Sequence, residues 1–406
     1  MQENTVSANL DFVVSKRAKN VSLGLIAVGL LALVVGIATN HTEGNQRFWG
    51  GLLFNGFFFF GISLGALFFY ALQHATETAW TVLLRRVFEA IFSYLPYGAI
   101  VLVVVFAAGS FHIHHLYHWM NPEVYNPQSE EFDAILANKA TFLNQPFFWI
   151  RTLVYLGTFI FAAYWFRKQS VLEDEIGGTE IHYKSYRRAA LFLVFFAVFS
   201  STLSWDWIMS IDAHWFSTMF GWYTFSGMWI SGMITATILT VYLRSRGFLP
   251  LLTDSHIHDM GKWVFAVSFL WSYLWFSQFM LIWYSNIPEE VTYFMTRFEH
   301  YRILFFTTFF VNFALPMVVL IARDAKRNVK FLITVGSIIF VGHWMDVFLM
   351  VAPGTMHEQG QIGFMEIGLF LMFLGAFIFI VMNQLTKANL VPTKSPFLDE
   401  SIQHSI

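Results

Sequence analysis

Residues 204–223 read SWDWIMSIDAHWFSTMFGWY, and this stretch ends one long apolar segment and begins the next. It places three ionisable side chains, Asp206, Asp212 and His214, among four tryptophans. Tryptophan is enriched where hydrocarbon meets water, and an unpaired carboxylate is costly inside a bilayer. The stretch therefore predicts a turn at a membrane interface, either one that handles protons or an ordinary interfacial loop with aromatic anchors.

The composition indicates the class of protein. Of 406 residues, 56% are hydrophobic and 12% are charged, whereas about 25% of the residues of an average soluble domain are charged. We therefore expect a multi-pass membrane protein in contact with lipid. The net charge of −2 carries no information about nucleic acid, and because no basic tract is present we expect no nucleic-acid partner.

The chain contains no cysteine. It therefore holds no disulfide, thiolate metal site, iron–sulfur cluster or thioether-linked haem of its own, and any such cofactor is expected in a partner. The first twenty residues are polar and carry no cleavable signal, so the first apolar segment is expected to direct insertion.

Ten apolar segments are long enough to cross about 30 Å of hydrocarbon as helices. They predict an all-α membrane protein with one transmembrane domain, residues 21–386, between tails at 1–20 and 387–406. The segments cover residues 21–38, 51–72, 88–111, 147–166, 189–208, 219–243, 263–285, 303–322, 331–351 and 362–384.

The distribution of basic residues predicts the orientation. Of 24 Lys and Arg, 19 lie in the two tails and the even-numbered loops. Because cytoplasmic loops carry the excess of positive charge, we expect both termini in the cytoplasm and residues 204–223 facing outward. The largest outward segment, 112–145, is long enough to form a docking surface, and the tail after Lys387 is expected to be extended.

A weak internal repeat relates spans two to five, in a unit at about 51–211, to spans six to nine, at about 216–353. Span five begins RRAALFL and ends SWD, and span nine begins KRNVKFL and contains HWMD. Spans three and seven share Ser-Tyr-Leu, and spans two and six share ladders of small residues. These likenesses favour two parallel four-helix bundles with spans one and ten peripheral, although chance similarity of apolar helices is an alternative.

Ionisable residues are rare within the spans, so each requires a reason. Asp206 lies at the outer end of span five, and His343 and Asp346 lie one turn apart on span nine. Glu366 enters span ten from outside. Together they predict an outward proton path or the polar wall of a ligand pocket, and the alternative is a structural pair such as His343 with Asp346.

At the cytoplasmic side, His74 and Glu77 end span two and Glu89 begins span three. They are candidates for an inner proton entrance, or for solvated loop ends. In span eight, Asn312 and Pro316 predict an opened backbone ladder near mid-membrane.

His114 and His118 have the spacing of paired ligands on one helix face. Because no carboxylate completes a known pattern nearby, interfacial histidines are favoured over a metal site. A haem with two axial histidines inside the membrane is also not expected, since His343 is the only histidine at that depth.

Three motifs carry a family resemblance. Residues 204–223, WYSNIPEE at 283–290 and HWMD at 343–346 resemble the NrfD-like membrane subunits of alternative complex III, a bacterial quinol:electron-acceptor oxidoreductase. The ten-span layout is similar across nearly the whole chain. The compact length resembles the ActF type of these subunits more than its larger sister type.

The resemblance implies a subunit of the bacterial inner membrane without a redox centre of its own. It implies a sister NrfD-like subunit and extrinsic iron–sulfur and cytochrome c subunits that carry the clusters and haems. Quinol would be oxidised at an outward pocket, here or only in the sister subunit. The matching positions, proposed for protons or quinol, are Asp206, Asp212, His214, Glu289, Glu290, His343 and Asp346.

The leading hypothesis is therefore a proton-conducting and scaffolding subunit of a quinol-oxidising respiratory complex, with a possible contribution to the quinol site. A proton-coupled secondary transporter is an alternative, because repeated bundles with membrane-embedded acids also suit transport. A purely structural anchor for extrinsic redox subunits is the third hypothesis.

Overall fold

A computed structural model describes residues 12–39 and 45–405, and these residues form helices without any strand. Ten helices are long and apolar enough to cross a membrane, one for each predicted segment. They are α1 Lys16–Thr39, α2 Gln46–Ala75, α3 Arg85–Phe92 continued by α4 Leu95–Ser110, α6 Gln145–Ile176, α7 Glu180–Trp207, α8 Met219–Ser245, α9 Asp254–Ser285, α11 Arg302–Phe309 continued by α12 Leu315–Val319, α14 Val329–Met356 and α15 Phe364–Leu385.

Shorter helices lie between and beyond these spans. They are η2 Val82–Leu84, η3 His118–Met120, η4 Pro122–Tyr125, α5 Ala134–Lys139, η5 Met209–Asp212, α10 Pro288–His300, η6 Phe310–Ala314, α13 Arg323–Arg327, η7 His357–Gln359 and α16 Leu398–Ile402.

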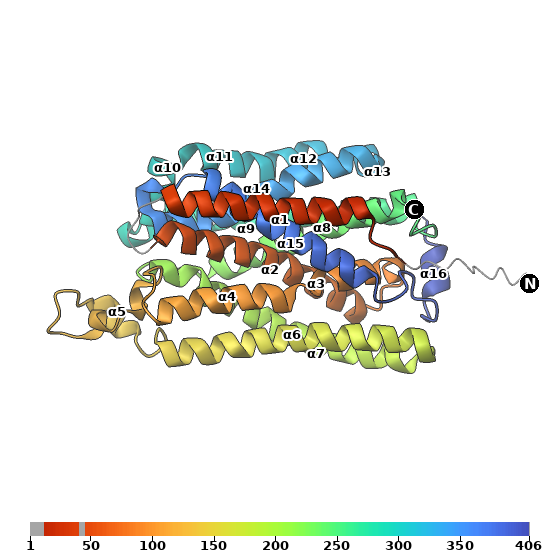
Figure 1. The fold of residues 1–406 in the computed structure, drawn as a ribbon, viewed down its shortest axis with the longest axis horizontal. Coiled ribbons are helices and arrows are strands. Elements are labelled where there is room, and N and C mark those ends of the chain that lie inside the picture. Colours follow the sequence, from red (N-terminus) through yellow and green to blue (C-terminus); the bar gives the residue numbers. More distant parts are fainter. Residues whose placement is uncertain (1–11, 40–44, 406) are drawn as a thin grey trace, which may run out of the picture.

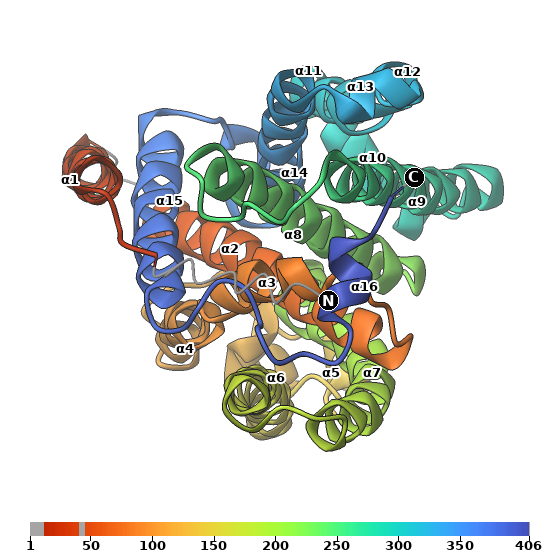
Figure 2. The same ribbon diagram turned by 90° about the vertical axis from the view of Figure 1, so that its right-hand side faces the viewer.

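Successive long helices run in opposite directions, so the described chain begins and ends at the same end of the bundle (Figure 1). We call this the inner end, following the predicted orientation, and the end that carries α5 the outer end. Viewed from the inner end, α2 and α8 cross the middle of the bundle side by side (Figure 2). Helices α4, α6 and α7 lie on one side of this pair, and α9, α11 and α14 lie on the other. The internal duplication itself remains a prediction from the sequence.

Glycines allow α2 and α8 to touch through their backbones. A Cβ atom on Gly65 would lie 2.2 Å from the carbonyl oxygen of Met228, and one on Gly232 would lie 2.8 Å from the nitrogen of Ala66. Small residues at such crossings permit the close packing that drives helix association in lipid. The small-residue ladders therefore build the central contact of the fold.

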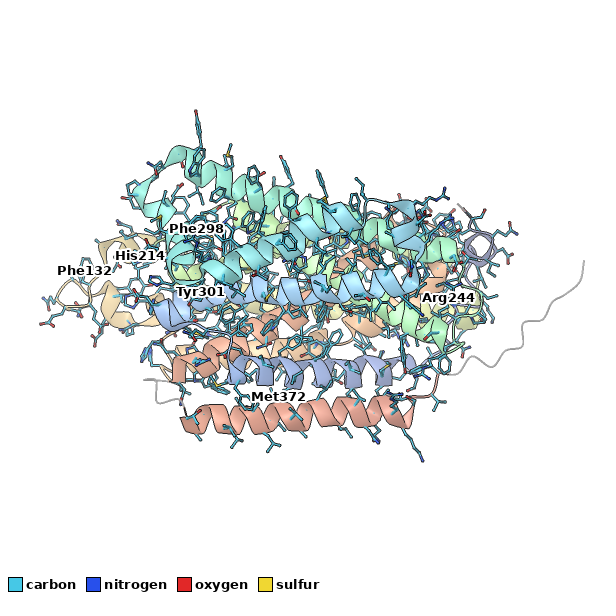
Figure 3. The ribbon with its side chains drawn as sticks, turned by 90° about the horizontal axis from the view of Figure 1, so that it is seen from above. Phe132, His214, Arg244, Phe298, Tyr301 and Met372 are labelled. Atoms are coloured by element: carbon cyan, nitrogen blue, oxygen red, sulfur yellow. The ribbon has the colours of Figure 1, made fainter. Side chains whose placement is uncertain are left out.

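Helix α1 begins earlier than the predicted residue 21 and packs along α15 (Figure 1). Its buried residues, Ser22, Gly29, Ala32 and Gly36, are all small. Gly29 lies against Gly368 and Met372 of α15, and Met372 is labelled between the two helices in Figure 3. The remaining faces of α1 are mostly exposed, as expected for a peripheral helix in lipid. Residues 1–11 of the predicted N-terminal tail lie outside the described residues.

Prolines mark two departures from regular α-helix. Pro316 cannot donate to the carbonyl four residues earlier, that of Asn312, and the backbone there widens into the π-helical turn η6. The predicted opening of span eight is therefore present. In span three, the helix breaks at Ser93 and Tyr94 just before Pro96, and the apolar segment begins at Val82 rather than at residue 88.

The C-terminal tail is folded against the inner end, contrary to the extended tail expected from its few apolar residues. Leu390 and Val391 are buried, and α16 follows them. Ser401 donates a hydrogen bond of 3.0 Å to the carbonyl oxygen of Trp80, and Nε2 of His404 lies 2.7 Å from Oδ2 of Asp259. Polar contacts with residues outside the tail help to hold it, and a count of apolar residues does not reveal such contacts.

Candidate functional site

The candidate site is centred on Asp346, which is buried among α8, α9 and α14 with 2% of its surface exposed. Tyr223 donates its hydroxyl proton to Oδ1, and the indole nitrogen of Trp271 donates to Oδ2 over 3.2 Å. These two donors stabilise a carboxylate where water is scarce. Sequence reasoning placed Asp346 in the site but did not identify its donors.

His343 lies on the same face of α14 as Asp346, one turn toward the inner end. Its ring meets Trp271 edge to face, with the ring centres 5.2 Å apart. Neither ring nitrogen has a hydrogen-bond partner among the described residues, although His343 is buried. The predicted structural pair of His343 with Asp346 is thus not formed, and both ring nitrogens remain available to a partner such as water.

The side chain of Asn312 is also buried without a hydrogen-bond partner among the described residues. Its side-chain nitrogen and oxygen are buried without a partner in the described part of the chain, and they sit against Gly342, next to His343. The amide thus adds two more polar atoms that require hydration at the level of the π-helical turn.

Three separate cavities lie between the outer end and Asp346. The outermost has a volume of about 650 Å³ and is lined by five histidines together with Asp212 and Glu358. A second, of about 70 Å³, adjoins it at Asp212, Thr296 and Gly354. A third, of about 10 Å³, shares one lining residue, Met350, with the second, and His343 and Asp346 lie in its wall. The third cavity is about the size of a single water molecule. We call the three cavities together the cavity file, and their sizes suit water and protons rather than a larger solute.

Arg297 lines the middle cavity and is buried. Its guanidinium donates two hydrogen bonds, of 3.1 and 2.7 Å, to the carbonyl oxygen of Leu349. Pro353 lies four residues after Leu349 in α14 and cannot supply the usual backbone donor, so Arg297 replaces it. Among the described residues, no carboxylate forms an ion pair with Arg297. Its guanidinium carbon lies 3.4 Å from the centre of the Tyr293 ring, on which it stacks. The positive charge therefore faces the route between Asp212 and Asp346.

His214 and Asp212 lie at the outer surface. Nε2 of His214 lies 2.5 Å from Oδ2 of Asp133, which caps α5 through the backbone N–H groups of Ile135 and Leu136. Figure 3 labels His214 at the outer end together with Phe132 and Tyr301. Burial opposes ionisation of Asp133, but the Leu136 N–H and the His214 imidazole outweigh it, so the pKa of this carboxyl lies below its usual range. The contact ties the outward loop to the turn after α7.

Asp206 belongs to a separate, closed ion pair. Arg151 of α6 donates to both carboxylate oxygens at 2.7 Å, and the Tyr155 hydroxyl adds a third bond of 3.0 Å. The guanidinium of Arg151 also lies against the rings of Phe142 and Phe147, which meet edge to face. A carboxylate held by three donors is suited to joining α6 to α7, so the structure favours a structural role for Asp206.

Glu366 forms a second closed pair. It is fully buried and accepts two hydrogen bonds from Arg47, of 2.6 and 2.7 Å, and one of 2.8 Å from the backbone of Gly363. These bonds join the outer ends of α2 and α15. Glu366 therefore lies outside the cavity file.

Glu289 and Glu290 lie in the first turn of α10, where carboxylates suit the helix dipole. Glu289 is exposed and Glu290 is partly exposed, and neither lines the cavities described above. The structure thus does not bring them together with Asp346.

The three inner candidates do not share one path. Glu89 is buried and binds Arg86 at 2.7 Å, Arg167, and the Ser170 hydroxyl at 2.5 Å. Its acceptor sites are occupied by an ion network that joins α3 to α6. Such saturation indicates a structural centre.

His74 and Glu77 lie beside this network. Nδ1 of His74 lies 3.1 Å from the carbonyl oxygen of Tyr70, and its ring stacks on the same tyrosine. Glu77 is 44% exposed and lies 3.6 Å from Nε2 of His182. The two are therefore not joined to Glu89 by a direct hydrogen bond.

Of the histidines after α4, only His118 is helical, as the first residue of the short helix η3, so His114 and His118 do not lie on one helix face as expected of paired ligands. Nε2 of His114 lies 2.9 Å from the carbonyl oxygen of Val105, and Nδ1 accepts from the Leu116 backbone. Burial lowers the pKa of His114. Within the described residues, no group of three His, Asp or Glu is arranged to hold a metal ion.

Four residues that complete these sites were missed by the sequence analysis: Arg151, Tyr223, Trp271 and Arg297. Arg151 lies inside a predicted span, and a buried cation requires a partner, so a search for an acid on a neighbouring helix would have suggested its pairing. Tyr223 and Trp271 gave no comparable signal, because 19% of all residues are aromatic.

A scan against protein-family models finds no match for this chain, and a search of curated proteins finds no similar protein.

Proposed function

We propose that this chain is a membrane subunit that conducts protons between its outer surface and Asp346. We place it in a respiratory quinol-oxidising complex of the alternative complex III type, where it also supports extrinsic iron–sulfur and cytochrome c subunits. The file of three cavities that ends at Asp346 and His343 is the observation that carries the proton-conducting role. The place in the complex rests on the resemblance of the three motifs.

The proposed proton transfer follows from the order of the ionisable side chains along the cavity file. The outer cavity contains imidazoles, which exchange protons near neutral pH. Arg297 stands next along the route, and its charge favours an ionised Asp346 and opposes the passage of metal cations. A proton that reaches Asp346 can pass by one water to His343, whose ring nitrogens are unoccupied.

The sizes of the cavities favour protons over direct oxidation of quinol at Asp346. Pockets for small molecules usually enclose about 300–1,000 Å³, whereas the two cavities nearest Asp346 measure about 70 and 10 Å³. A quinol ring therefore does not fit beside Asp346. The same sizes argue against the transporter alternative, which needs a solute site at mid-membrane.

The test is quinol oxidation and proton release by the complex purified with its native partners and placed in liposomes. Asp346→Asn retains the size of the side chain and removes its charge, and Tyr223→Phe removes one donor. Both variants are expected to slow proton release, the first by about 10²-fold, the scale of a lost acid–base group. Glu289→Gln is the matched control, since this acid lies outside the file.

Haem spectra of the purified complex establish whether each variant still assembles. Full turnover and full proton release in an assembled Asp346→Asn complex would refute the proton role and favour the structural anchor. A solitary, colourless protein that moves a solute would refute the assignment to a respiratory complex.

A further inference from the structure

A groove lies between α6 and α7 on the outside of the bundle, where these helices form one edge of the molecule (Figure 2). Its volume is about 440 Å³. It is lined by Gly157, Thr158, Phe161, Ala162, Trp165, Phe166, Arg188, Leu191, Phe192 and Phe195. Nine of these ten side chains are uncharged, and four are phenylalanines.

The groove faces the surroundings of the bundle rather than its core. Phe161 is 68% exposed and Phe195 is 46% exposed, and both belong to helices apolar enough to span a membrane. Gly157 opens the groove, because a Cβ atom there would meet nothing within 4 Å. Lipid chains would therefore contact this surface in a bilayer.

Arg188 is the single charged residue of the lining, and it is exposed. It makes no ion pair or hydrogen bond with the described residues. Three other inner arginines differ from it, since Arg85, Arg86 and Arg167 each pair with a carboxylate. An available guanidinium thus stands at one end of an aromatic channel.

The depth of Arg188 suits a lipid headgroup. It directly precedes residue 189, where the apolar span is predicted to begin, and it lies eight residues, or about 12 Å, along α7 from Glu180. From the edge of the span a long arginine side chain can extend to the headgroup level while its methylene groups stay against the apolar groove. Basic pockets between helices at the cytoplasmic side are suited to phosphate headgroups.

We propose that this groove binds an anionic phospholipid of the inner leaflet, with one acyl chain along the phenylalanines and the phosphate on Arg188. Charge complementarity selects the headgroup, because the guanidinium fork matches two phosphate oxygens and has no competing carboxylate. The length of the apolar lining selects a lipid over free phosphate. This proposal requires only that the inner end faces the cytoplasm, and it is independent of the proton path.

The experiment uses the full chain in detergent, titrated with phosphatidylglycerol or with phosphatidylcholine of the same acyl chains, and counts bound lipids by native mass spectrometry. The wild type is expected to retain one phosphatidylglycerol at least tenfold more tightly than phosphatidylcholine. Arg188→Gln is expected to remove this preference. Arg187→Gln is the matched control, since Arg187 is also exposed but does not line the groove.

A second variant tests the groove without changing charge. Gly157→Leu fills open space, so it is expected to lower the affinity for both lipids at least tenfold while the unfolding temperature is retained. Equal binding of phosphatidylglycerol by wild type and Arg188→Gln would overturn the proposal. So would equal retention of the two lipids by wild type, or a cross-link from the groove to a partner's helix in the native complex.

Discussion

Pro353 and Arg297 form a complementary pair. The proline leaves the carbonyl of Leu349 without its backbone donor, and the guanidinium supplies two donors in its place. A lone buried carbonyl costs about 1–3 kcal/mol. The turn of α14 that contains Pro353, about two turns beyond Asp346, is thus stabilised by a side chain from α10.

Arg297→Met is expected to lower the stability of the protein by about 1–3 kcal/mol, because Leu349 loses its donors. In Arg297→Met/Pro353→Ala, the new N–H of residue 353 can bond to Leu349, so the double variant should lose less than the sum of the two single losses. Thermal unfolding in detergent measures all three. Additive losses would show that Arg297 does not act through this carbonyl.

The contact between Asp133 and His214 predicts a response to acid. The pKa of Asp133 is lowered in the folded protein, so its contribution to stability is present above the unfolded value of about 3.9 and is lost as the pH falls below it. We expect the segment around α5 to resist limited proteolysis at pH 7 and pH 5 and to become sensitive below about pH 4. In Asp133→Asn, resistance should already be reduced at pH 7. Equal resistance of wild type and variant across this range would show that the contact does not hold the loop.

Helices α2 and α8 are joined by direct backbone contact, and this makes their glycines sensitive to substitution. Gly65→Ala is expected to destabilise the protein by about 1–3 kcal/mol, the usual cost of overpacking, since the added Cβ would lie 2.2 Å from the Met228 carbonyl oxygen. Gly24→Ala in α1 is the control, because a Cβ there meets nothing within 4 Å. Unfolding temperatures of the two variants provide the measurement. Equal values would show that α2 and α8 can separate at no cost.

The ion pairs explain how other helices are joined. Arg151 with Asp206 links α6 to α7, and Arg47 with Glu366 links α2 to α15. Buried pairs of this kind contribute little net stability but are costly to break from one side. The two ion pairs determine which helix faces meet. Asp346, in contrast, is paired with no arginine of the described chain and lies beside a cavity.

Both termini of the described chain lie at one end of the bundle, and the distribution of charge predicts that this end faces the cytoplasm. Because the natural chain has no cysteine, single cysteines report the orientation without background. In intact cells, Gln128→Cys in the outer loop should react with a membrane-impermeant maleimide, and Ser245→Cys at the end of α8 should react only after lysis. Labelling of Ser245→Cys in intact cells would reverse the assigned orientation and exclude the inner-leaflet lipid site.

The number and approximate limits of the ten long helices were predictable because they depend on local properties. A run of apolar residues must form a helix to satisfy its backbone in lipid, and Pro316 blocks one defined hydrogen bond whatever surrounds it. The same reasoning identified Asp346 and His343, since any ionisable group within a span requires a reason.

The partners of the buried groups could not be predicted in this way. Asp206 and Asp346 are both acids in the outer halves of their helices, yet the first meets an arginine and the second meets a tyrosine and a tryptophan beside a water-sized cavity. This difference depends on which faces of distant helices come together, and glycine contacts and ion pairs between helices decide that. Hydropathy describes each helix against lipid, whereas the chemistry of a carboxylate depends on its neighbours within about 4 Å.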